Sequence, residues 1–379
     1  MNGPPLAMNS DEAGAAYQAD GSLQDEEALD GVEKANENEN DAPPADKRAS
    51  PRDSPGAKPR RVLVLGATGT IGRATTRALI ARGHEVVCFV RESSVERAYH
   101  LPPDAVVRMG DVMDPTSVDA EGFRGHHFEA VVSCMASRSG APADAWAVDH
   151  QAHLNVLRAA EEHGVKHFVL LSAICVQKPR LAFQKAKLAF EEALHASSLR
   201  WSIVRPTAYF KSLSGQLGRV QAGKPFLVFG DGKLTPCKPI GDDDLGAYLA
   251  GCLDDRERWN RVLPIGGPGP ALTPLDHGEL LFAATGREPR FRHVPVAILD
   301  TIVAVLSALG RVIPPLKEKS ELARIGRYYA TESMLVWDDE VGRYDADATP
   351  EFGTETLGEY YEKLVRGEMK DERGEHAVF

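Results

Sequence analysis

Residues 60–94 read RRVLVLGATGTIGRATTRALIARGHEVVCFVRESS, and this stretch decides the fold. Its apolar run at 62–65 is typical of a short strand in the buried centre of a parallel sheet. Three glycines at G-x-x-G-x-x-G spacing follow this run: Gly66, Gly69 and Gly72. A helical pattern then covers 71–82, and a second strand pattern covers 85–90. The order strand, glycine turn, helix and strand predicts the first unit of a dinucleotide-binding Rossmann fold.

Each glycine of this turn has a physical task. The first permits the tight turn out of the strand, the second lets the backbone approach a pyrophosphate, and the third lets helix and strand pack closely. The helix N-terminus adds free N–H groups and the positive end of the helix dipole. We therefore expect these residues to bind the cofactor: Gly66, Thr68, Gly69, Thr70, Ile71 and Gly72. The alternative is a tight turn that binds no ligand.

The residue after the second strand indicates which dinucleotide is bound. An NAD enzyme places an acidic residue there, against the ribose hydroxyls. This chain has Arg91 instead, followed closely by Ser93, and a guanidinium can bind a 2′-phosphate through two N–H groups. The expected cofactor is therefore NADPH, with Arg91 and Ser93 among its ligands. Glu92 leaves open the alternative that Arg91 is only a solvated charge at the strand end.

Strand and helix patterns alternate through the following residues. Strands are expected at 106–112, 130–137, 167–173 and 201–206, with helices at 146–163 and 180–195. This alternation predicts an α/β fold with a doubly wound parallel sheet, which binds ligands at the carboxyl ends of its strands. We expect Asp111 beside the adenine, Ser133 near the ribose and Pro206 against the cofactor, because all three lie near strand ends. Ser172 is a catalytic candidate for the same reason.

The stretch 171–187, LSAICVQKPRLAFQKAK, lies where short-chain dehydrogenases carry a serine, a tyrosine and a lysine four residues beyond the tyrosine. Phe183 occupies the tyrosine position, and Lys187 follows on the same helix face. Lysine can still hold the nicotinamide ribose, but a carbonyl reductase also needs the phenol as an acid. Reduction of an alkene needs a hydride donor and a proton from water or another group. Lys187 is therefore a catalytic and cofactor-binding candidate, and a surface lysine is the alternative.

Composition and charge limit the class of protein. A chain of 379 residues, 43% of them hydrophobic, can bury one large core or two medium ones. Of the net charge of −11, residues 1–60 carry −7, so the charge of the remainder is nearly balanced. It lacks the excess of basic residues that nucleic-acid binding requires. Residues 1–59 are acidic and poor in aromatic and β-branched side chains, which predicts a disordered extension.

Targeting and metal-binding signals are weak. The N-terminal sequence resembles neither a secretory signal nor a transit peptide, so a cytoplasmic protein is expected. Five cysteines without C-x-x-C spacing indicate a reducing compartment. The histidines do not cluster with them, and we expect no protein-bound metal.

Several longer stretches resemble one family closely: FVLLSAICVQKPRLAFQKAKLAFE, SIVRPTAYFKSLSGQ, GKPFLVFGDGKLTPCKPI, VLPIGGPGPALTPL and IGRYYATESML. They are similar to the NADPH-dependent divinyl chlorophyllide 8-vinyl-reductases, an atypical extended branch of the short-chain dehydrogenases. The resemblance covers roughly residues 60–370. It implies reduction of the C8 vinyl group of divinyl chlorophyllide or protochlorophyllide to ethyl, in chlorophyll or bacteriochlorophyll biosynthesis. It also implies that Phe183 is normal in this family and that magnesium belongs to the pigment.

The second half of the chain is expected to bind the substrate. We divide the chain into the extension 1–59, an NADPH-binding core 60–206, and a smaller substrate-binding region 207–379 that is partly interleaved with the core. The stretch 207–216 directly follows the last predicted sheet strand, so we expect Tyr209, Phe210 and Lys211 to line the nicotinamide end of the pocket. Lys211 is a candidate partner for the pigment propionate. Ordinary core packing is the alternative for the two aromatic residues.

The apolar stretch 294–316 is interrupted by Asp300 and is too short to span a membrane. It predicts either a helix that lies at a photosynthetic membrane surface or covers the pigment, or a helix packed in the core. Two other functions stay open: a non-catalytic sensor of the NADP(H) ratio, and a reductase of phenolic natural products. The sequence does not indicate the preferred pigment, the proton donor, the role of the extension or the oligomeric state.

Overall fold

The structure is a computed structural model that describes residues 58–372. The expected disorder of the acidic extension therefore falls outside the described residues, apart from residues 58 and 59. All elements below belong to the unit that follows Asp46.

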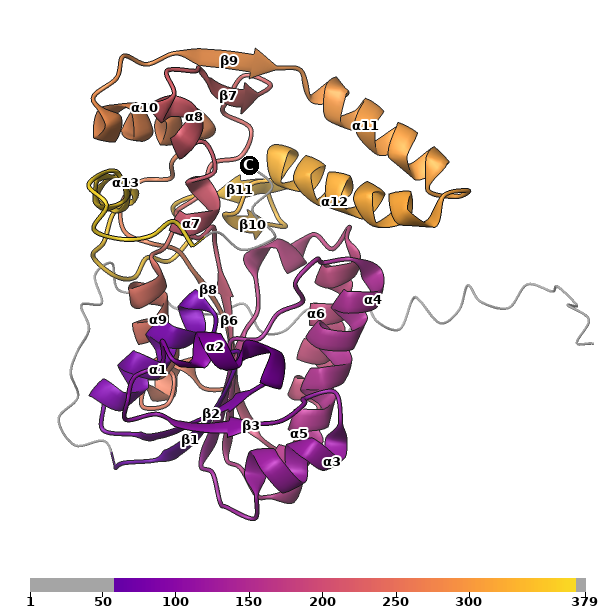
Figure 1. Cartoon of the computed structure of the whole chain (residues 1–379), viewed down its shortest axis with the longest axis vertical. Coiled ribbons are helices and arrows are strands. Elements are labelled where there is room, and N and C mark those ends of the chain that lie inside the picture. The colour runs from indigo at the N-terminus through magenta and orange to yellow at the C-terminus, as the bar shows by residue number, and fades with distance from the viewer. Residues whose placement is uncertain (1–57, 373–379) are drawn as a thin grey trace, which may run out of the picture. The chain divides into compact units, whose positions relative to one another are not determined.

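Within residues 58–372, seven parallel strands form one sheet in the order β3-β2-β1-β4-β5-β6-β8 (Figure 1). Their bounds are Arg61–Leu65 (β1), Glu85–Val90 (β2), Val106–Met109 (β3), Ala130–Ser133 (β4), His167–Leu171 (β5), Arg200–Pro206 (β6) and Arg261–Ile265 (β8). The order runs outward in both directions from β1 and β4, which confirms the doubly wound Rossmann fold. All strand ends that could meet a cofactor therefore lie along one edge.

Helices cover both faces of this sheet. α1 (Thr70–Ala81) and α9 (Asp242–Gly251) pack on one face, and α5 (His153–Glu162) and α6 (Ala182–His195) pack on the other (Figure 1). Alternate residues of β1 explain why both faces are buried: Val62 and Val64 belong to the first core, and Leu63 and Leu65 to the second. A strand covered on both sides reads as a continuous apolar run.

Short helical segments complete this layer. They are η1 (Glu92–Ser94), α2 (Val95–Ala98), α3 (Pro115–Ser117), η2 (Val118–Phe123), α4 (Pro142–Ala145), η3 (Trp146–Ala152), η4 (Ile174–Gln177) and η5 (Arg256–Arg258). The helix expected over 146–163 is in fact a π-helical turn, η3, followed by α5. Such π turns often occur at functional sites.

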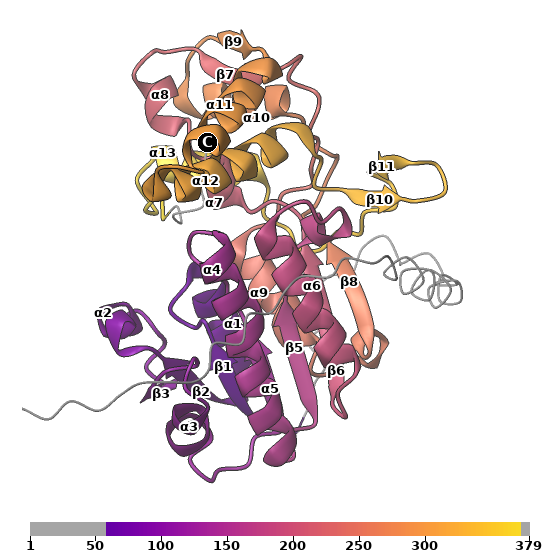
Figure 2. The same ribbon diagram turned by 90° about the vertical axis from the view of Figure 1, so that its right-hand side faces the viewer.

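A second group of elements lies beyond the carboxyl ends of the strands, as Figures 1 and 2 show. It contains α7 (Phe210–Leu213), α8 (Leu217–Gln221), β7 (Phe226–Phe229), α10 (Pro274–Thr285), β9 (Phe291–Val294), α11 (Val296–Leu309), α12 (Pro314–Thr331), β10 (Val336–Asp338), β11 (Arg343–Asp345) and α13 (Leu357–Val365). Between these elements the chain returns to the sheet as α9 and β8. A division at residue 206 remains a proposal.

Residues 230–253 lead from the C-terminal elements back to the sheet. The strand before this segment, β7, pairs in parallel with the distant β9. Helix α9 begins after Gly241, and the aspartate run lies in its first turn rather than at the cap. Asp244 instead accepts hydrogen bonds from the backbone N–H groups of Thr354 and Glu355, and thereby holds the C-terminal segment.

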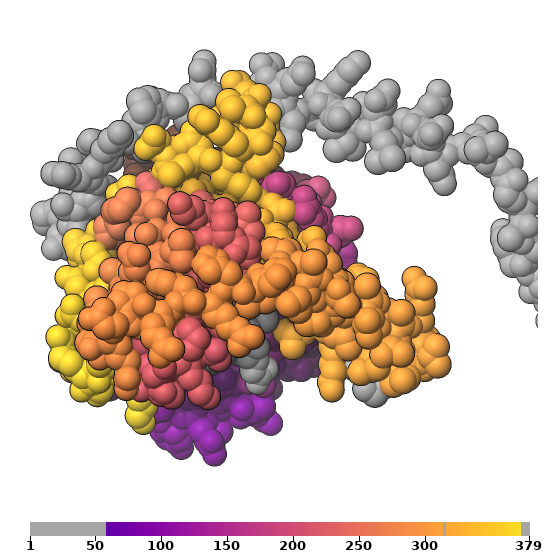
Figure 3. Space-filling model, turned by 90° about the horizontal axis from the view of Figure 1, so that it is seen from above, coloured from indigo at the N-terminus to yellow at the C-terminus, as the bar shows by residue number. Residues whose placement is uncertain are grey.

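Helix α11 contains no buried residue, so the expectation that it packs in the core is wrong. It packs along α12, and its orange surface is visible in Figure 3. Among the described helices, none is both long enough and apolar enough to cross a membrane.

Candidate active site

The glycine turn is shaped by close backbone contacts. Gly66 has a φ of +68°, and a Cβ there would lie 2.6 Å from the carbonyl carbon of Cys134 at the end of β4. A Cβ on Gly72 would overlap the carbonyl oxygen of Gly66. The fold itself therefore requires glycine at both positions.

Gly69 is different, because neither its conformation nor its neighbours require glycine. Its φ is −74°, and the contact found for a Cβ at this position is an ordinary one, 3.4 Å from the Gly66 oxygen. Gly69 is exposed and caps α1 without any side-chain hydrogen bond, and the first turn of α1 has no acidic residue. An uncapped helix N-terminus beside an exposed glycine fits a pyrophosphate.

The other residues expected in this turn have different surroundings. Thr68 and Thr70 are half-buried, while the Ile71 side chain is buried in the core beneath the turn. Any contact of Ile71 with a cofactor would therefore come from its backbone. The Lys211 ammonium donates a hydrogen bond to the Thr70 hydroxyl.

Three residues expected at the adenosine end lie after neighbouring strands. Arg91 and Ser93 are exposed directly after β2, and Asp111 is exposed after β3. Asp111 Oδ1 accepts the Met113 N–H at 2.9 Å, which orders the loop after β3. Because β2 and β3 are adjacent and parallel, these side chains share the edge that also carries the glycine turn.

Ser133 does not offer its hydroxyl to a cofactor, and this corrects the sequence-based expectation. Its side chain is fully buried, and its Oγ lies 2.8 Å from His153 Nε2. Burial and the nearby Lys187 charge lower the pKa of His153 to about 4, so the ring is neutral. His153 Nδ1 donates to the Val148 carbonyl, so Nε2 accepts the serine proton. Ser133 therefore ties β4 to α5.

Ser172 is also turned away from the expected site. Its hydroxyl donates to Glu191 Oε1 at 2.5 Å, and both residues are buried. The same carboxylate binds the Arg205 guanidinium of β6. Since the hydroxyl is engaged beneath α6, we withdraw the catalytic assignment of Ser172.

Lys187 has a buried partner that sequence reasoning missed. Its ammonium lies 3.0 Å from Asp149 Oδ1, and the Asp149 side chain has no exposed area. Asp149 Oδ2 also accepts the Ser137 hydroxyl at 2.6 Å. Asp149 lies in the π-helical turn η3. The sequence feature that could have identified it is a carboxylate among the apolar residues before α5. Lys187 is thus a fixed cation, which argues against a surface lysine.

The phenylalanine at the tyrosine position is part of a core. Phe183 is 9% exposed and packs in a cluster with Cys175 of η4 and Ile325 and Tyr328 of α12. Pro206 is buried at the end of β6. These contacts join the edge of the sheet to the C-terminal elements.

Tyr209, Phe210 and Lys211, which lie shortly after β6, have different surroundings. Tyr209 is half-buried at the sheet edge, where burial strongly raises its pKa and keeps the phenol protonated. Phe210 is 2% exposed and packs against Tyr360, so its expected role as a pocket residue is wrong and the core-packing alternative holds. Burial lowers the pKa of Lys211, which lies 3.9 Å from Asp242 and beside Thr70. Lys211 is therefore next to the glycine turn.

Comparison with known proteins gives the family. The model of an NAD(P)H-binding family matches residues 66–256. Divinyl chlorophyllide a 8-vinyl-reductase, chloroplastic, of Oryza sativa subsp. indica is 47% identical over 350 residues, which cover 89% of this chain and 86% of that protein. The protein of the same name from Arabidopsis thaliana is 45% identical over 341 residues, with coverages of 86% and 80%. The chain belongs to the divinyl chlorophyllide a 8-vinyl-reductase family.

The family resemblance seen in the sequence is thereby confirmed, and so is the NAD(P)H-binding domain. Among solved structures, AtPrR2 with NADP+ and (+)pinoresinol superposes with a TM-score of 0.61 at 18% identity, covering 82% of this chain and 99% of that one. At this identity the likeness shows the fold alone. The match to the Oryza sativa vinyl reductase covers 89% of the chain, which is more than the 66–256 segment of the NAD(P)H-binding family.

Proposed function

We propose that this protein reduces the C8 vinyl group of divinyl chlorophyllide or protochlorophyllide to ethyl, with NADPH as the electron donor. The observation that carries the proposal is the 47% identity to a named vinyl reductase over 89% of the chain. The site supports it, because Lys187 is held by Asp149 while residue 183 lacks a phenol. A carbonyl reductase uses a phenol at this position to protonate the ketone oxygen, whereas the carbanion formed from an alkene can take its proton from another group.

This proposal assigns a binding role to each charged group of the site. When bound, NADPH supplies a hydride. The uncapped N-terminus of α1 and Lys211 hold the pyrophosphate, Arg91 binds the 2′-phosphate, and Lys187 holds the nicotinamide ribose. Positioning the reacting carbons within about 3–3.5 Å is the main contribution of such groups.

The proposal is tested by turnover of the full-length protein with NADPH and each divinyl pigment. We expect a blue shift of the Soret band, because loss of the vinyl group shortens the conjugated system. Binding of NADPH with no spectral change for either pigment would favour the NADP(H)-ratio sensor. Reduction of a phenolic substrate instead would favour the third function. The same assay gives the preferred pigment.

The choice of NADPH over NADH leads to a prediction about Arg91. Arg91→Ala should weaken NADPH binding by about 1–3 kcal/mol and change NADH binding little, since charge-assisted hydrogen bonds to the 2′-phosphate are lost. The measurement is fluorescence titration of both cofactors. Arg343→Ala, an exposed arginine of β11, is the control and should bind both normally. Equal losses for NADPH and NADH would contradict the assignment.

We also propose that the protein binds peripherally to a photosynthetic membrane through α11. Four apolar residues share one helix face at spacings of four, three and four, and are 42–51% exposed: Ile298, Ile302, Val305 and Leu309. Val312, three residues beyond the end of α11, is 82% exposed. Nearby Arg311, Lys317 and Lys319 are exposed cations that suit anionic headgroups.

This membrane proposal predicts a loss of lipid binding on adding charge to α11. Ile302→Glu together with Val305→Glu should weaken binding to vesicles of anionic phospholipid at least tenfold, since two apolar side chains no longer enter the interface. Vesicle sedimentation measures this. Val341→Glu, at an exposed turn between β10 and β11, is the matched control. Equal binding of parent and double variant would exclude α11 as the contact.

A further inference from the structure

The site lacks a proton donor at the position where related folds carry one, because Phe183 cannot donate. Phe183 packs against the segment 325–329 of α12, a helix that begins about 130 residues later in the chain. The structure therefore brings a distant part of the sequence to the place of the missing phenol. Two tyrosines follow each other in this part of α12, Tyr328 and Tyr329.

These two tyrosines have different surroundings. Tyr328 is buried, and its hydroxyl donates to the carbonyl oxygens of Cys175 at 3.0 Å and Lys178 at 3.2 Å. Tyr329 is half-buried, with its ring perpendicular to that of Tyr328 at a centroid distance of 5.8 Å. The Tyr329 hydroxyl faces the Cys175 thiol, a weak hydrogen-bond partner. Tyr328 therefore holds the helix in place through two carbonyl groups, whereas the Tyr329 hydroxyl has a weak hydrogen-bond partner.

The same thiol connects Tyr329 with the lysine site. Tyr329 packs against the core cluster that contains Cys175 and Phe183, and Phe183 lies one helical turn before Lys187 on α6. Tyr209, after β6, contributes to the raised pKa of Tyr329. We call Cys175, Lys187, Tyr209 and Tyr329 the phenol cluster. It draws one residue from each of four separate segments at the carboxyl edge of the sheet. In the proposed function Lys187 holds the nicotinamide ribose, and this arrangement would bring Tyr329 beside the reacting end of the cofactor.

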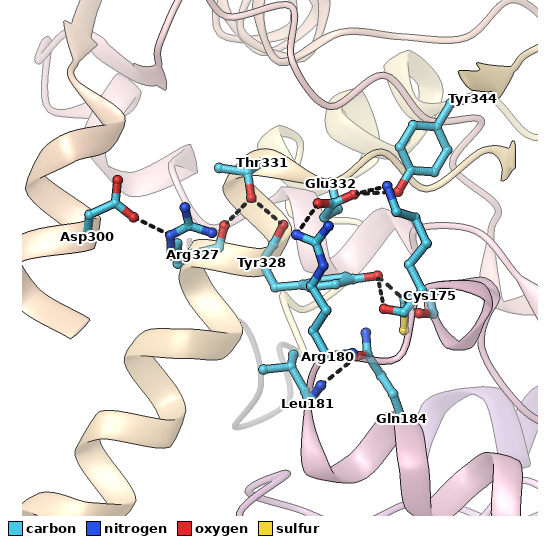
Figure 4. Close-up of polar contacts among 11 residues, drawn as sticks. Cys175, Arg180, Leu181, Gln184, Asp300, Arg327, Tyr328, Thr331, Glu332 and Tyr344 are labelled. Atoms are coloured by element: carbon cyan, nitrogen blue, oxygen red, sulfur yellow. Dashed lines mark hydrogen bonds and ion pairs between the residues drawn. The ribbon is translucent and has the colours of Figure 1, made fainter. Parts of the chain in front are cut away.

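A polar network fixes α12 against the core, and Figure 4 shows its members. Glu332, at the end of α12, pairs with Arg180 at 2.6 Å and Lys178 at 3.1 Å, and accepts the Tyr344 hydroxyl at 2.6 Å. Burial alone would raise the pKa of Glu332, but the hydrogen bonds from Tyr344 and Lys178 and the Arg180 charge lower it below its ordinary value. The carboxylate is therefore ionised at neutral pH and holds α12 firmly.

We propose that Tyr329 is the proton donor of the reaction. The inference rests on the proposed vinyl reduction. A hydride from NADPH adds to the terminal vinyl carbon, the C=C π bond breaks, and the negative charge spreads into the macrocycle. The carbon next to the ring then takes the proton of the Tyr329 hydroxyl, which completes the ethyl group and leaves NADP+. Water reprotonates the phenolate.

Burial and the neighbouring groups support this role. They raise the pKa of Tyr329 well above its ordinary value. The phenol therefore stays protonated throughout the neutral range and is available as an acid.

The test is single-turnover reduction of divinyl chlorophyllide by the full-length Tyr329→Phe variant at saturating NADPH. We expect the rate to fall at least about a hundredfold, which is the usual minimum contribution of a general acid. The affinity for NADPH and the melting temperature should stay close to those of the parent, because phenylalanine keeps the ring. The solvent deuterium isotope effect of the parent should change in the variant, since water then delivers the proton.

Tyr328→Phe is the matched control. It removes the neighbouring phenol of α12, whose hydroxyl donates to the carbonyl oxygens of Cys175 and Lys178, and should keep the rate within a few-fold of the parent even if the melting temperature falls. A parental rate for Tyr329→Phe, or a large loss confined to Tyr328→Phe, would overturn the assignment. A slow Tyr329→Phe variant that has also lost NADPH binding or melts earlier would show a structural role, and would equally overturn it. If the parent reduces neither pigment, the proposed function fails instead.

Discussion

Replacing Lys187 with alanine should lower the single-turnover rate of vinyl reduction by about a hundredfold or more. The ammonium is held 3.0 Å from the buried Asp149 carboxylate, so its position is well defined. Misplacing the hydride by about 1 Å costs about a hundredfold in rate. Rapid-mixing absorbance of the pigment with bound NADPH measures the effect. Lys185→Ala, an exposed lysine of the same helix, should keep the parental rate.

The lysine variant also leaves a buried carboxylate without its cation, which costs about 3–5 kcal/mol of stability. The double variant Asp149→Asn with Lys187→Met removes both charges and keeps a side chain of similar length. It should recover most of the stability and none of the rate. If Lys187→Ala keeps the parental rate, or if the double variant recovers it, Lys187 does not position the cofactor.

The second large effect is expected in the glycine turn, where two substitutions of the same size should act differently. Gly72→Ala should destabilise the fold by about 1–3 kcal/mol, because the new methyl group overlaps the backbone carbonyl of Gly66. Gly69→Ala should leave the melting temperature nearly unchanged, because the protein leaves room for the methyl group. Thermal unfolding without cofactor tests both statements.

Binding of NADPH should then separate the roles of these glycines. Gly69→Ala is expected to weaken NADPH binding at least tenfold, because the methyl group would occupy the space in which the backbone approaches the pyrophosphate. Calorimetric titration of the folded variant gives the dissociation constant. Normal binding by Gly69→Ala would show that the pyrophosphate lies elsewhere, whatever Gly72→Ala does to stability.

The failures among the expected site residues have a common cause. Ser133 and Ser172 lie at or just beyond strand ends, as expected, but their side chains face α5 and α6. Successive residues of a strand face opposite sides, so a position near a strand end does not decide what the hydroxyl meets. Phe210 was placed correctly after β6, yet its ring enters the core with Tyr360. In each case a neighbour from elsewhere in the chain decided the outcome.

The sequence by itself determined the features that depend on local spacing. The glycine turn, the alternation of the first six strands with helices and the missing phenol at Phe183 could all be read from it, because backbone conformation and periodicity act over a few residues. Only the tertiary structure decided which side chains share the site. Asp149 meets Lys187 across 38 residues, and Tyr329 reaches Cys175 from a different helix. Such contacts depend on how whole elements pack, since burial is shared among segments distant in sequence, and no local pattern encodes them.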